Sequence, residues 1–193
     1  RGIGQMTPCE SSEDFSRSSE SDDLYVLSKA IEQGDHGRVA GLVGTVKDTK
    51  GLSQCLVLAC ALGKPDCVQL LITAHAPIDQ TGGKDGTTPL YHACNRGHDG
   101  CVQLLLAAHA AIDQADDHGG TPLLIACSHN HNDCVQLLLA AHAAVDQACS
   151  KGNTPLLMAC AQCHNDCVQL LLAAHAAIEH ANNEGITPLL AAT

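Results

Sequence analysis

One phrase recurs at a nearly constant spacing along this chain. It reads C-V-Q-L-L-L-A-A-H-A-A-I-D-Q from Cys101 to Gln114, and near-copies begin at Cys134 and Cys167. These three cysteines are 33 residues apart, and an earlier copy begins at Cys67, 34 residues before Cys101. A period of this length is typical of stacked supersecondary units, each of which packs only on its neighbours. The repeat therefore predicts an elongated stack with a continuous core.

The composition suits such a stack and argues against several kinds of partner. Hydrophobic residues make up 45% of the chain but aromatic residues only 2%, so the core must consist of Leu, Ala, Val and Cys. With a formal net charge of −11, the chain lacks the basic surface that nucleic acid or an anionic membrane requires. No apolar run approaches the roughly 20 residues of a membrane-spanning helix. We therefore expect neither nucleic acid nor a membrane as the partner.

The cysteines follow the repeat, unlike those of a disulfide scaffold. Equivalent positions in adjacent layers should lie about 8–10 Å apart, whereas a disulfide needs Cα atoms within about 7 Å. We therefore expect buried free thiols and a reducing compartment, cytoplasmic or nuclear. Two positions of the repeat hold eight of the cysteines: Cys60, Cys94, Cys127 and Cys160, then Cys67, Cys101, Cys134 and Cys167.

Each unit has the pattern of two short helices. Thr121 is a good N-cap and Pro122 suits the first helical position. The first helix should end at Asn130, which tolerates a left-handed backbone, and the second should begin near Asp133. Helices this short are unstable alone, so stability must come from stacking. A histidine follows each second helix and is predicted to cap it, at His75, His109, His142 and His175.

The chain divides into a tail and a repeat region. Residues 1–23 are acidic and Ser-rich, which predicts a disordered tail. Residues 24–193 should form about five layers, with a degenerate first layer over Leu24–Thr45. Because the chain opens with Arg1 and stops at Thr193 inside a motif, we expect a piece of a longer protein whose last repeat is truncated.

The repeat resembles the ankyrin repeat, in which T-P-L-H-x-A precedes a Gly-His turn and V-x-x-L-L. Thr88-Pro89-Leu90, Thr121-Pro122-Leu123, Thr154-Pro155-Leu156 and Thr187-Pro188-Leu189 match the first part, and Gly97-His98 matches the turn. Three features depart from the family pattern. The histidine after T-P-L is replaced by Tyr91 and its equivalents, the glycine after the second helix is replaced by histidine, and Gln54-Cys55-Leu56 has lost T-P-L.

The resemblance implies an all-α ankyrin-repeat solenoid of 33-residue helix-turn-helix units joined by β-hairpin turns. It also implies a non-enzymatic protein-interaction scaffold, without a cofactor, that binds a protein partner through a concave groove of hairpin tips and first helices. We expect a monomer. The groove positions are the most variable between repeats, although freely varying solvent-exposed loops would look the same. Carried over by position, they are Lys84, Asp85, Thr87, Asn95, Arg96, Asp117, His118, Ser128, His129, Ser150, Lys151, Asn153 and Gln162.

Two alternatives come from other classes of protein. Cys160, Cys163 and His164 have the C-x-x-C-H spacing of haem attachment, and with Cys167 they resemble a zinc-ligand cluster. The repeat itself accounts for all of these residues except Cys163, so we favour a structural role. The second alternative is a targeting segment of a larger multidomain enzyme. The chain contains none of the common nucleotide-binding or hydrolase motifs.

Overall fold

In the computed structural model of this chain, residues 13–82 and 85–192 are described, with side chains from residue 22 onward. These residues form helices joined by turns, with no strand among them. The all-α stack expected from the repeat is confirmed. In order, the helices are α1 (Glu13–Gln33), α2 (His36–Leu42), α3 (Thr49–Ala61), α4 (Pro65–Thr73), α5 (Pro89–Arg96), α6 (Asp99–Ala107), α7 (Pro122–Ser128), α8 (Asn132–Ala140), α9 (Pro155–Ala161), α10 (Asn165–Ala173) and α11 (Pro188–Ala191).

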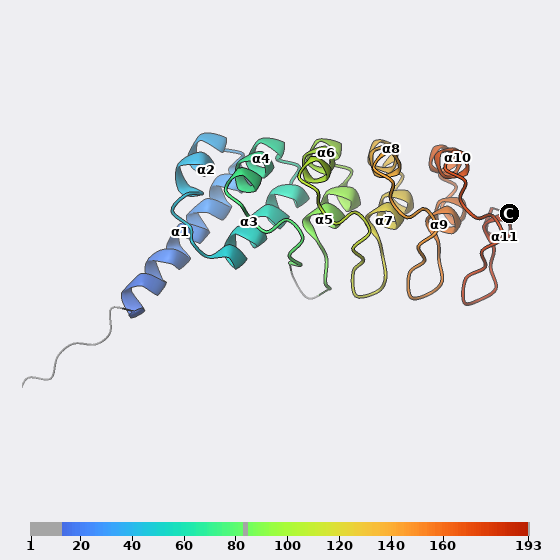
Figure 1. The fold of residues 1–193 in the computed structure, drawn as a ribbon, viewed down its shortest axis with the longest axis horizontal. Helices are drawn as coiled ribbons and strands as arrows, with labels where there is room; N and C mark the ends of the chain where they lie inside the picture. Colours follow the sequence, from blue (N-terminus) through green and yellow to red (C-terminus); the bar gives the residue numbers. More distant parts are fainter. Residues whose placement is uncertain (1–12, 83–84, 193) are drawn as a thin grey trace, which may run out of the picture.

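The helices form two parallel rows with a third row of loops (Figure 1). The first helices of the layers, α1, α3, α5, α7, α9 and α11, pack on one another in sequence order. The second helices, α2, α4, α6, α8 and α10, form the other row, and each packs on the first helix of its own layer. The loops that connect one layer to the next extend away from the helices on the side of the first helices. Each layer from α5 onward therefore offers a helix face and a loop tip.

The core consists of leucines that repeat along both rows. Almost no surface of these side chains is accessible to solvent. Because each layer buries small aliphatic groups against the next, the fold needs no large rings, as the composition predicts. The first helices contribute Leu27, Leu56, Leu90, Leu123 and Leu156, and the second helices contribute Leu71, Leu105, Leu138 and Leu171.

Thr-Pro pairs set the start of the later first helices. The Thr121 side chain accepts a hydrogen bond from the Leu124 N–H at 3.1 Å, and Pro122 is the first residue of α7. Thr88 and Thr154 cap α5 and α9 in the same way. The capping predicted from the sequence is confirmed.

The expected left-handed turns are also present. Asn130 has φ +60°, and the histidines after the second helices have φ between +59° and +63°. The N–H of His109 donates to the Leu106 carbonyl and that of Ala110 to the Leu105 carbonyl, both at 3.0 Å. This pair of hydrogen bonds is a Schellman motif, which gives the last carbonyls of the helix backbone N–H donors.

Two details of the expectation are not shown by the structure. Residues 13–23 of the predicted disordered tail belong to helix α1, which begins at Glu13, and for residues 1–12, which lie outside the described residues, disorder stays a prediction. Where β-hairpins were expected, the described residues form loops without strands. A single backbone hydrogen bond, such as that from the Asp116 N–H to the Gly120 carbonyl, closes the loop, and one bond does not make a strand ladder.

Candidate partner-binding surface

The loop tip of each later layer is closed by its own hydrogen bonds. In the loop before α7, the Asp116 carboxylate accepts the N–H of His118 at 2.9 Å and that of Gly120 at 2.7 Å. In the loop before α11, the Asn182 side-chain oxygen accepts the N–H groups of Glu184 and Ile186 in the same manner. These bonds fix the tip backbone, so the side chains at the tip project from a defined frame.

Adjacent tips are also joined to each other. The Asp117 N–H donates to the Asp85 carbonyl at 3.1 Å, and the Ser150 N–H donates to the His118 carbonyl at 2.8 Å. The Asn183 N–H continues the series with the Lys151 carbonyl at 3.1 Å. We call this backbone series, from Asp85 to Asn183, the tip ladder. It holds the loops of four layers in a fixed spacing.

Glycine is required where the tips approach one another. Gly119 has φ +79°, and a Cβ there would lie 3.0 Å from the Ser150 nitrogen and 3.1 Å from the Cys149 Cα. Both its backbone conformation and its neighbouring tip therefore exclude a side chain.

The structure exposes most of the predicted groove residues. Arg96 lies at the end of α5, and His129 and Gln162 lie just after α7 and α9. Lys84 lies outside the described residues. The exposed predicted residues are Asp85, Arg96, Asp117, His118, His129, Ser150, Lys151 and Gln162.

Four predicted residues are only partly exposed or buried among their own neighbours. Thr87 donates to the Gly82 carbonyl at 3.2 Å and lies 3.0 Å from His92 Nε2. The Asn153 side-chain oxygen accepts from the Asn182 side chain at 2.8 Å, and the Ser128 hydroxyl donates to the Ile125 carbonyl at 2.9 Å. Asn95 is half-buried. These polar groups support the frame, which leaves fewer of them for a partner.

Histidines tie α6, α8 and α10 to the layer before each of them. His98 and His131 donate through Nε2 to the carbonyls of Ala61 and Asn95, at 3.3 and 3.2 Å. His164 reaches the Cys127 carbonyl through Nδ1 at 2.9 Å, beside a turn that carries the Asn130 side chain. Since a carbonyl only accepts, the bonded ring nitrogen carries the proton in each case.

Aspartates form a second series of bonds between layers. Asp79 accepts from the Ala111 N–H at 2.8 Å, Asp113 from Ala144 at 2.9 Å and Asp146 from Ala177 at 2.9 Å. Each aspartate follows a second helix, and each donor follows the second helix of the next layer. We call this series the aspartate ladder. Each of its carboxylates accepts a backbone N–H of the next layer and so helps to hold the layers together.

Charge is distributed unequally over the two faces. Beyond residue 85, Arg96 and Lys151 are the only Lys or Arg residues, and both lie exposed on the face of first helices and tips. The row of second helices carries exposed acidic residues at its helix starts, Asp66, Asp99, Asp133 and Asp166. Because Asp85 and Asp117 are also exposed at the tips, the tip face carries charges of both signs, whereas the helix starts of the outer face carry acidic groups.

Two parts of this surface were not predicted from the sequence. The loop before α11 presents Asn183 and Glu184, both exposed, at the positions of Ser150 and Lys151. Its position could have been found from the Thr187-Pro188 pair that follows it.

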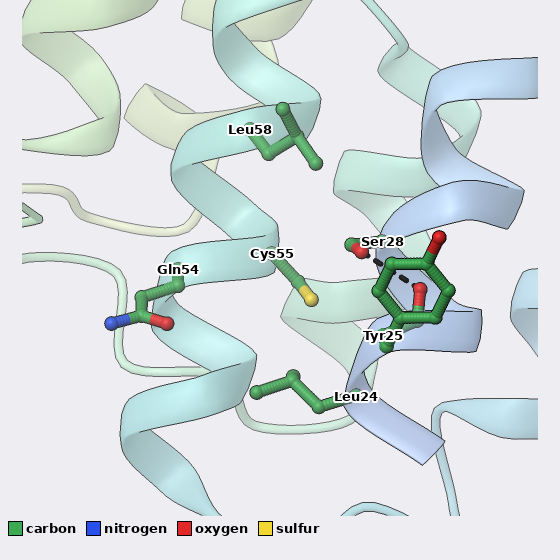
Figure 2. A pocket seen from close by; sticks show the side chains of 6 residues that line it. All are labelled: Leu24, Tyr25, Ser28, Gln54, Cys55 and Leu58. Atoms are coloured by element: carbon green, nitrogen blue, oxygen red, sulfur yellow. Dashed lines mark hydrogen bonds between the residues drawn. The ribbon is translucent and has the colours of Figure 1, made fainter. Parts of the chain in front are cut away.

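The second missed part is a cleft between α1 and α3 on the row of first helices, with a volume of about 290 Å³. Figure 2 shows its lining, with the Leu24 and Leu58 side chains and the Cys55 thiol between the two helices. The Tyr25 ring stands at the edge, and its backbone carbonyl accepts from the Ser28 hydroxyl at 2.8 Å. No single-sequence signal marks this cleft, because it arises where α1 and α3 pack.

The cysteine-histidine cluster does not converge in space. His164 is bonded to the preceding layer, and the Cys167 thiol donates to the Asn132 side-chain oxygen of that layer at 2.9 Å. Cys163 is exposed and has a left-handed backbone. Within the described part of the chain, no three His, Cys, Asp or Glu side chains are placed to hold one metal ion. The geometry gives the metal and haem alternatives no support.

Most repeat cysteines are buried free thiols, as expected. Burial raises the pKa of Cys101 to about 11 and that of Cys134 to about 12. A hydrogen bond with Cys167 and burial raise the pKa of Cys127. Such thiols are protonated at neutral pH and behave as small apolar groups.

Comparison with known families agrees with this architecture. Residues 56–149 match a family model of ankyrin repeats in three copies, and residues 151–183 match the model of an ankyrin repeat. The two matches cover more than half of the chain and exclude α1 and α2. No curated protein matches the chain. Among the described helices, none is long and apolar enough to cross a membrane.

Proposed function

Because the chain belongs to the ankyrin-repeat family, we propose that it is a non-enzymatic scaffold that binds a partner protein through the groove formed by its loop tips and first helices. Ankyrin repeats are generally protein–protein interaction modules and are typically not catalytic. The groove, its residues and the absence of catalysis in this chain are the parts that we propose.

One observation supports the proposal more than any other. The residues that differ most between layers, such as Asp117, His118, Ser150 and Lys151, project from tips whose backbone is bonded to its neighbours. A surface held in advance loses less conformational entropy when it binds. Freely varying loops would not require this support, so the tip ladder favours a binding role over an unconstrained one.

The charges indicate what such a partner should present. Arg96 and Lys151 would pair with carboxylates, and Asp85 and Asp117 with basic groups. Arg96 can form bidentate bonds with a carboxylate, so it should contribute more than Lys151. A partner of mixed charge, with an acidic group opposite Arg96, suits this surface best.

The remaining proposals concern the state of the protein. We propose a monomer without a bound cofactor, in the cytoplasm or nucleus, where buried thiols such as Cys101 and Cys134 stay reduced. Sedimentation that shows a concentration-dependent dimer, or a labelled chain found in an oxidising compartment, would contradict these statements.

Replacement of Arg96, His118 and Lys151 together by alanine tests the groove. Proteins captured by the wild type are identified by quantitative mass spectrometry, and their recovery on the variant is measured. The variant should lose the bound partner at least tenfold, because charged and aromatic groups at the centre of an interface carry most of its energy. All three side chains are exposed, so the fold should be unaffected.

A matched triple variant of the outer face provides the control. Gln103, Gln136 and Gln169 are exposed at equivalent positions of α6, α8 and α10, and their replacement by alanine should leave partner recovery unchanged. Full recovery on the groove variant, together with loss on the outer-face variant, would move the site to the second helices and refute the groove.

A further inference from the structure

Two buried thiols from adjacent layers are hydrogen-bonded to each other. Cys127 lies near the end of α7 and Cys167 in the first turn of α10, and both side chains are fully buried. The His164 ring, at the cap position of α10, bonds to the Cys127 carbonyl at 2.9 Å, so the start of α10 is held against the end of α7. The Cys127 thiol donates its hydrogen to the Cys167 sulfur. We call these two residues the thiol pair.

The spacing that keeps equivalent cysteines apart does not apply to the thiol pair. Cys127 belongs to the cysteines of the first helices, and Cys167 belongs to those of the second helices in the next layer. Equivalent cysteines are a full layer apart, but these two are not equivalent. The thiol pair therefore brings two sulfur atoms together inside the core, as the formation of a disulfide requires.

The surroundings of Cys167 differ from those of the equivalent cysteine one layer earlier. Burial and the nearby Asp99 carboxylate raise the pKa of Cys134 to about 12. Beside Cys167, the position of Asp99 is occupied by Asn132, whose amide carries no charge. The Cys167 sulfur lies 2.9 Å from the Asn132 side-chain oxygen. A polar but neutral neighbour thus replaces a carboxylate at this cysteine.

The second thiol favours the charged form of Cys167. The hydrogen bond from Cys127 lowers the pKa of Cys167, against the opposing effects of burial and of the Asp166 carboxylate. Cys167 is also the third residue of α10, and the N-terminal end of a helix stabilises a negative charge. A thiolate with a second thiol beside it is the arrangement of a cysteine that peroxide oxidises reversibly.

We propose that hydrogen peroxide oxidises the thiol pair to a disulfide that joins α7 to α10. The Cys167 thiolate attacks the peroxide, so that an S–O bond forms, the O–O bond breaks and hydroxide leaves. The Cys127 sulfur then attacks the resulting sulfenic acid, forms the S–S bond and releases its proton with the second hydroxide as water. In sum, two thiols are oxidised and one peroxide is reduced to two waters.

The burial of both sulfur atoms determines when this reaction takes place. Peroxide reaches Cys167 when the contact between the start of α10 and the end of α7 opens locally. Reducing surroundings keep the pair as thiols, so the disulfide forms only when peroxide rises. The site is independent of the proposed groove, because the reaction needs no partner protein.

Peptide mapping tests the proposal, because cleavage before aspartate separates the two thiols from all others. It yields peptides 117–132 and 166–193, each of which contains one cysteine of the thiol pair and no other. The whole chain carries Cys163→Asn, which replaces an exposed thiol with the residue that the preceding layer has. The chain is reduced, treated with hydrogen peroxide, blocked with N-ethylmaleimide and digested. Mass spectrometry should show these two peptides as the predominant cross-link, which dithiothreitol removes.

Variants in the same background test the chemistry. Asn132→Asp introduces the carboxylate that Cys134 has beside it, and it should slow the cross-link at least tenfold, because a nearby negative charge disfavours the thiolate. Cys127→Ala removes the second thiol, so oxidation of Cys167 should stop at a sulfenic acid that dimedone traps. The matched control, Cys94→Ala, removes the equivalent thiol one layer earlier and should leave the cross-link unchanged. Circular dichroism establishes that each variant is folded.

Three results would overturn the proposal. The first is a cross-link between peptides 117–132 and 166–193 that forms in urea but not in the folded chain. The second is an equal yield of the cross-link between peptides 85–98 and 133–145, which contain Cys94 and Cys134, because the thiol pair would then have no special reactivity. The third is oxidation of folded Asn132→Asp at the rate of the parent chain, which would remove the role of the thiolate.

Discussion

The first helices of the N-terminal and C-terminal layers differ in length although they pack in one row. α1 and α3 have 21 and 13 residues, whereas α5, α7 and α9 have 8, 7 and 7. The short helices all begin at the proline of a Thr-Pro pair. α3 instead begins six residues before Cys55, the equivalent of that proline, with Asp48 as its cap.

The difference shows that the Thr-Pro pair does two things. Proline cannot continue a helix toward its N-terminal side, because its ring disfavours a helical residue before it. The chain before it must therefore leave the helix direction, and in the later layers it forms a loop tip. Where Thr-Pro is missing, the helix runs on, and a cleft between α1 and α3 takes the place of tips. The same pair starts the helix and makes the tip possible.

The largest effect should come from proline in a long helix. Cys55→Pro places proline inside α3, where it removes a helical hydrogen bond and meets the Gly51 carbonyl. We expect a loss of about 3 kcal/mol or more in the free energy of unfolding by urea. Amide exchange at residues 49–54 should accelerate as the segment leaves the helix. Pro122→Ala, the matched change at a helix start, should cost less than about 1 kcal/mol; similar losses for both would refute the role of position.

A methyl group at an inter-helix turn should have the next largest effect. Gly97 has φ +71°, and a Cβ there would lie 2.4 Å from the His131 ring. Gly97→Ala should therefore cost about 1–2 kcal/mol for the left-handed backbone alone, and the His131 bond to Asn95 should weaken. Gly41→Ala in α2 has open space around it and should stabilise by up to about 1 kcal/mol. Thermal unfolding of both variants measures the contrast, and equal shifts of the same sign would contradict it.

Removal of a cap should have a smaller effect. Thr121→Ala leaves the Leu124 N–H without its acceptor at a buried helix start, so we expect a loss of about 1 kcal/mol in urea unfolding. Gln54 of α3 occupies the position of Thr121, so Gln54→Thr adds the threonine that Thr121→Ala removes. Because Gln54 lies inside α3, the added hydroxyl has no helix start to cap. It should change stability by less than about 0.5 kcal/mol. A gain of a full kcal/mol from Gln54→Thr would mean that threonine alone restores the short helix.

The smallest effect concerns pH. Burial and the Arg96 charge lower the pKa of His92 below the ordinary value of 6.5. The unfolded chain therefore binds a proton before the folded chain as the pH falls, so this contribution to stability is complete above about pH 6.5 and is lost below it. Between pH 7.5 and pH 5.5, the wild type should lose more stability than His92→Gln. The equivalent residues of α3, α7 and α9 are Leu58, Ile125 and Met158, so these three helices have no imidazole at this position. Parallel pH profiles for the two proteins would refute the role of His92.

The repeat region could be predicted well because its signals are local. Thr121 with Pro122 specifies a helix start, and His109 or Asn130 specifies a left-handed turn, within a few residues of sequence. The start of α1 at Glu13 could not be predicted in this way, because no Thr-Pro pair precedes it. The acidic, Ser-rich composition of that segment pointed to disorder instead.

The candidate surface was predicted less fully because its support comes from other layers. Thr87 and Asn153 were predicted as contact residues, but their side chains bond within the loops or between them. Asp113 reads as an exposed turn residue, although its partner is the Ala144 N–H of the next layer. The bonds of Asn153 and Asp113 join residues about one repeat apart, and no local pattern specifies which polar group turns inward.

The tip ladder has a consequence for how this protein can change. Each rung joins a main-chain N–H to a main-chain carbonyl, as between Ser150 and His118, and no side chain takes part. The residues at these positions can be exchanged while the bonds that hold the tip persist. The atoms that hold the tips and the side chains that would contact the proposed partner therefore belong to different parts of the same residues, so a point substitution at a tip should change the proposed contacts and leave the frame unaltered.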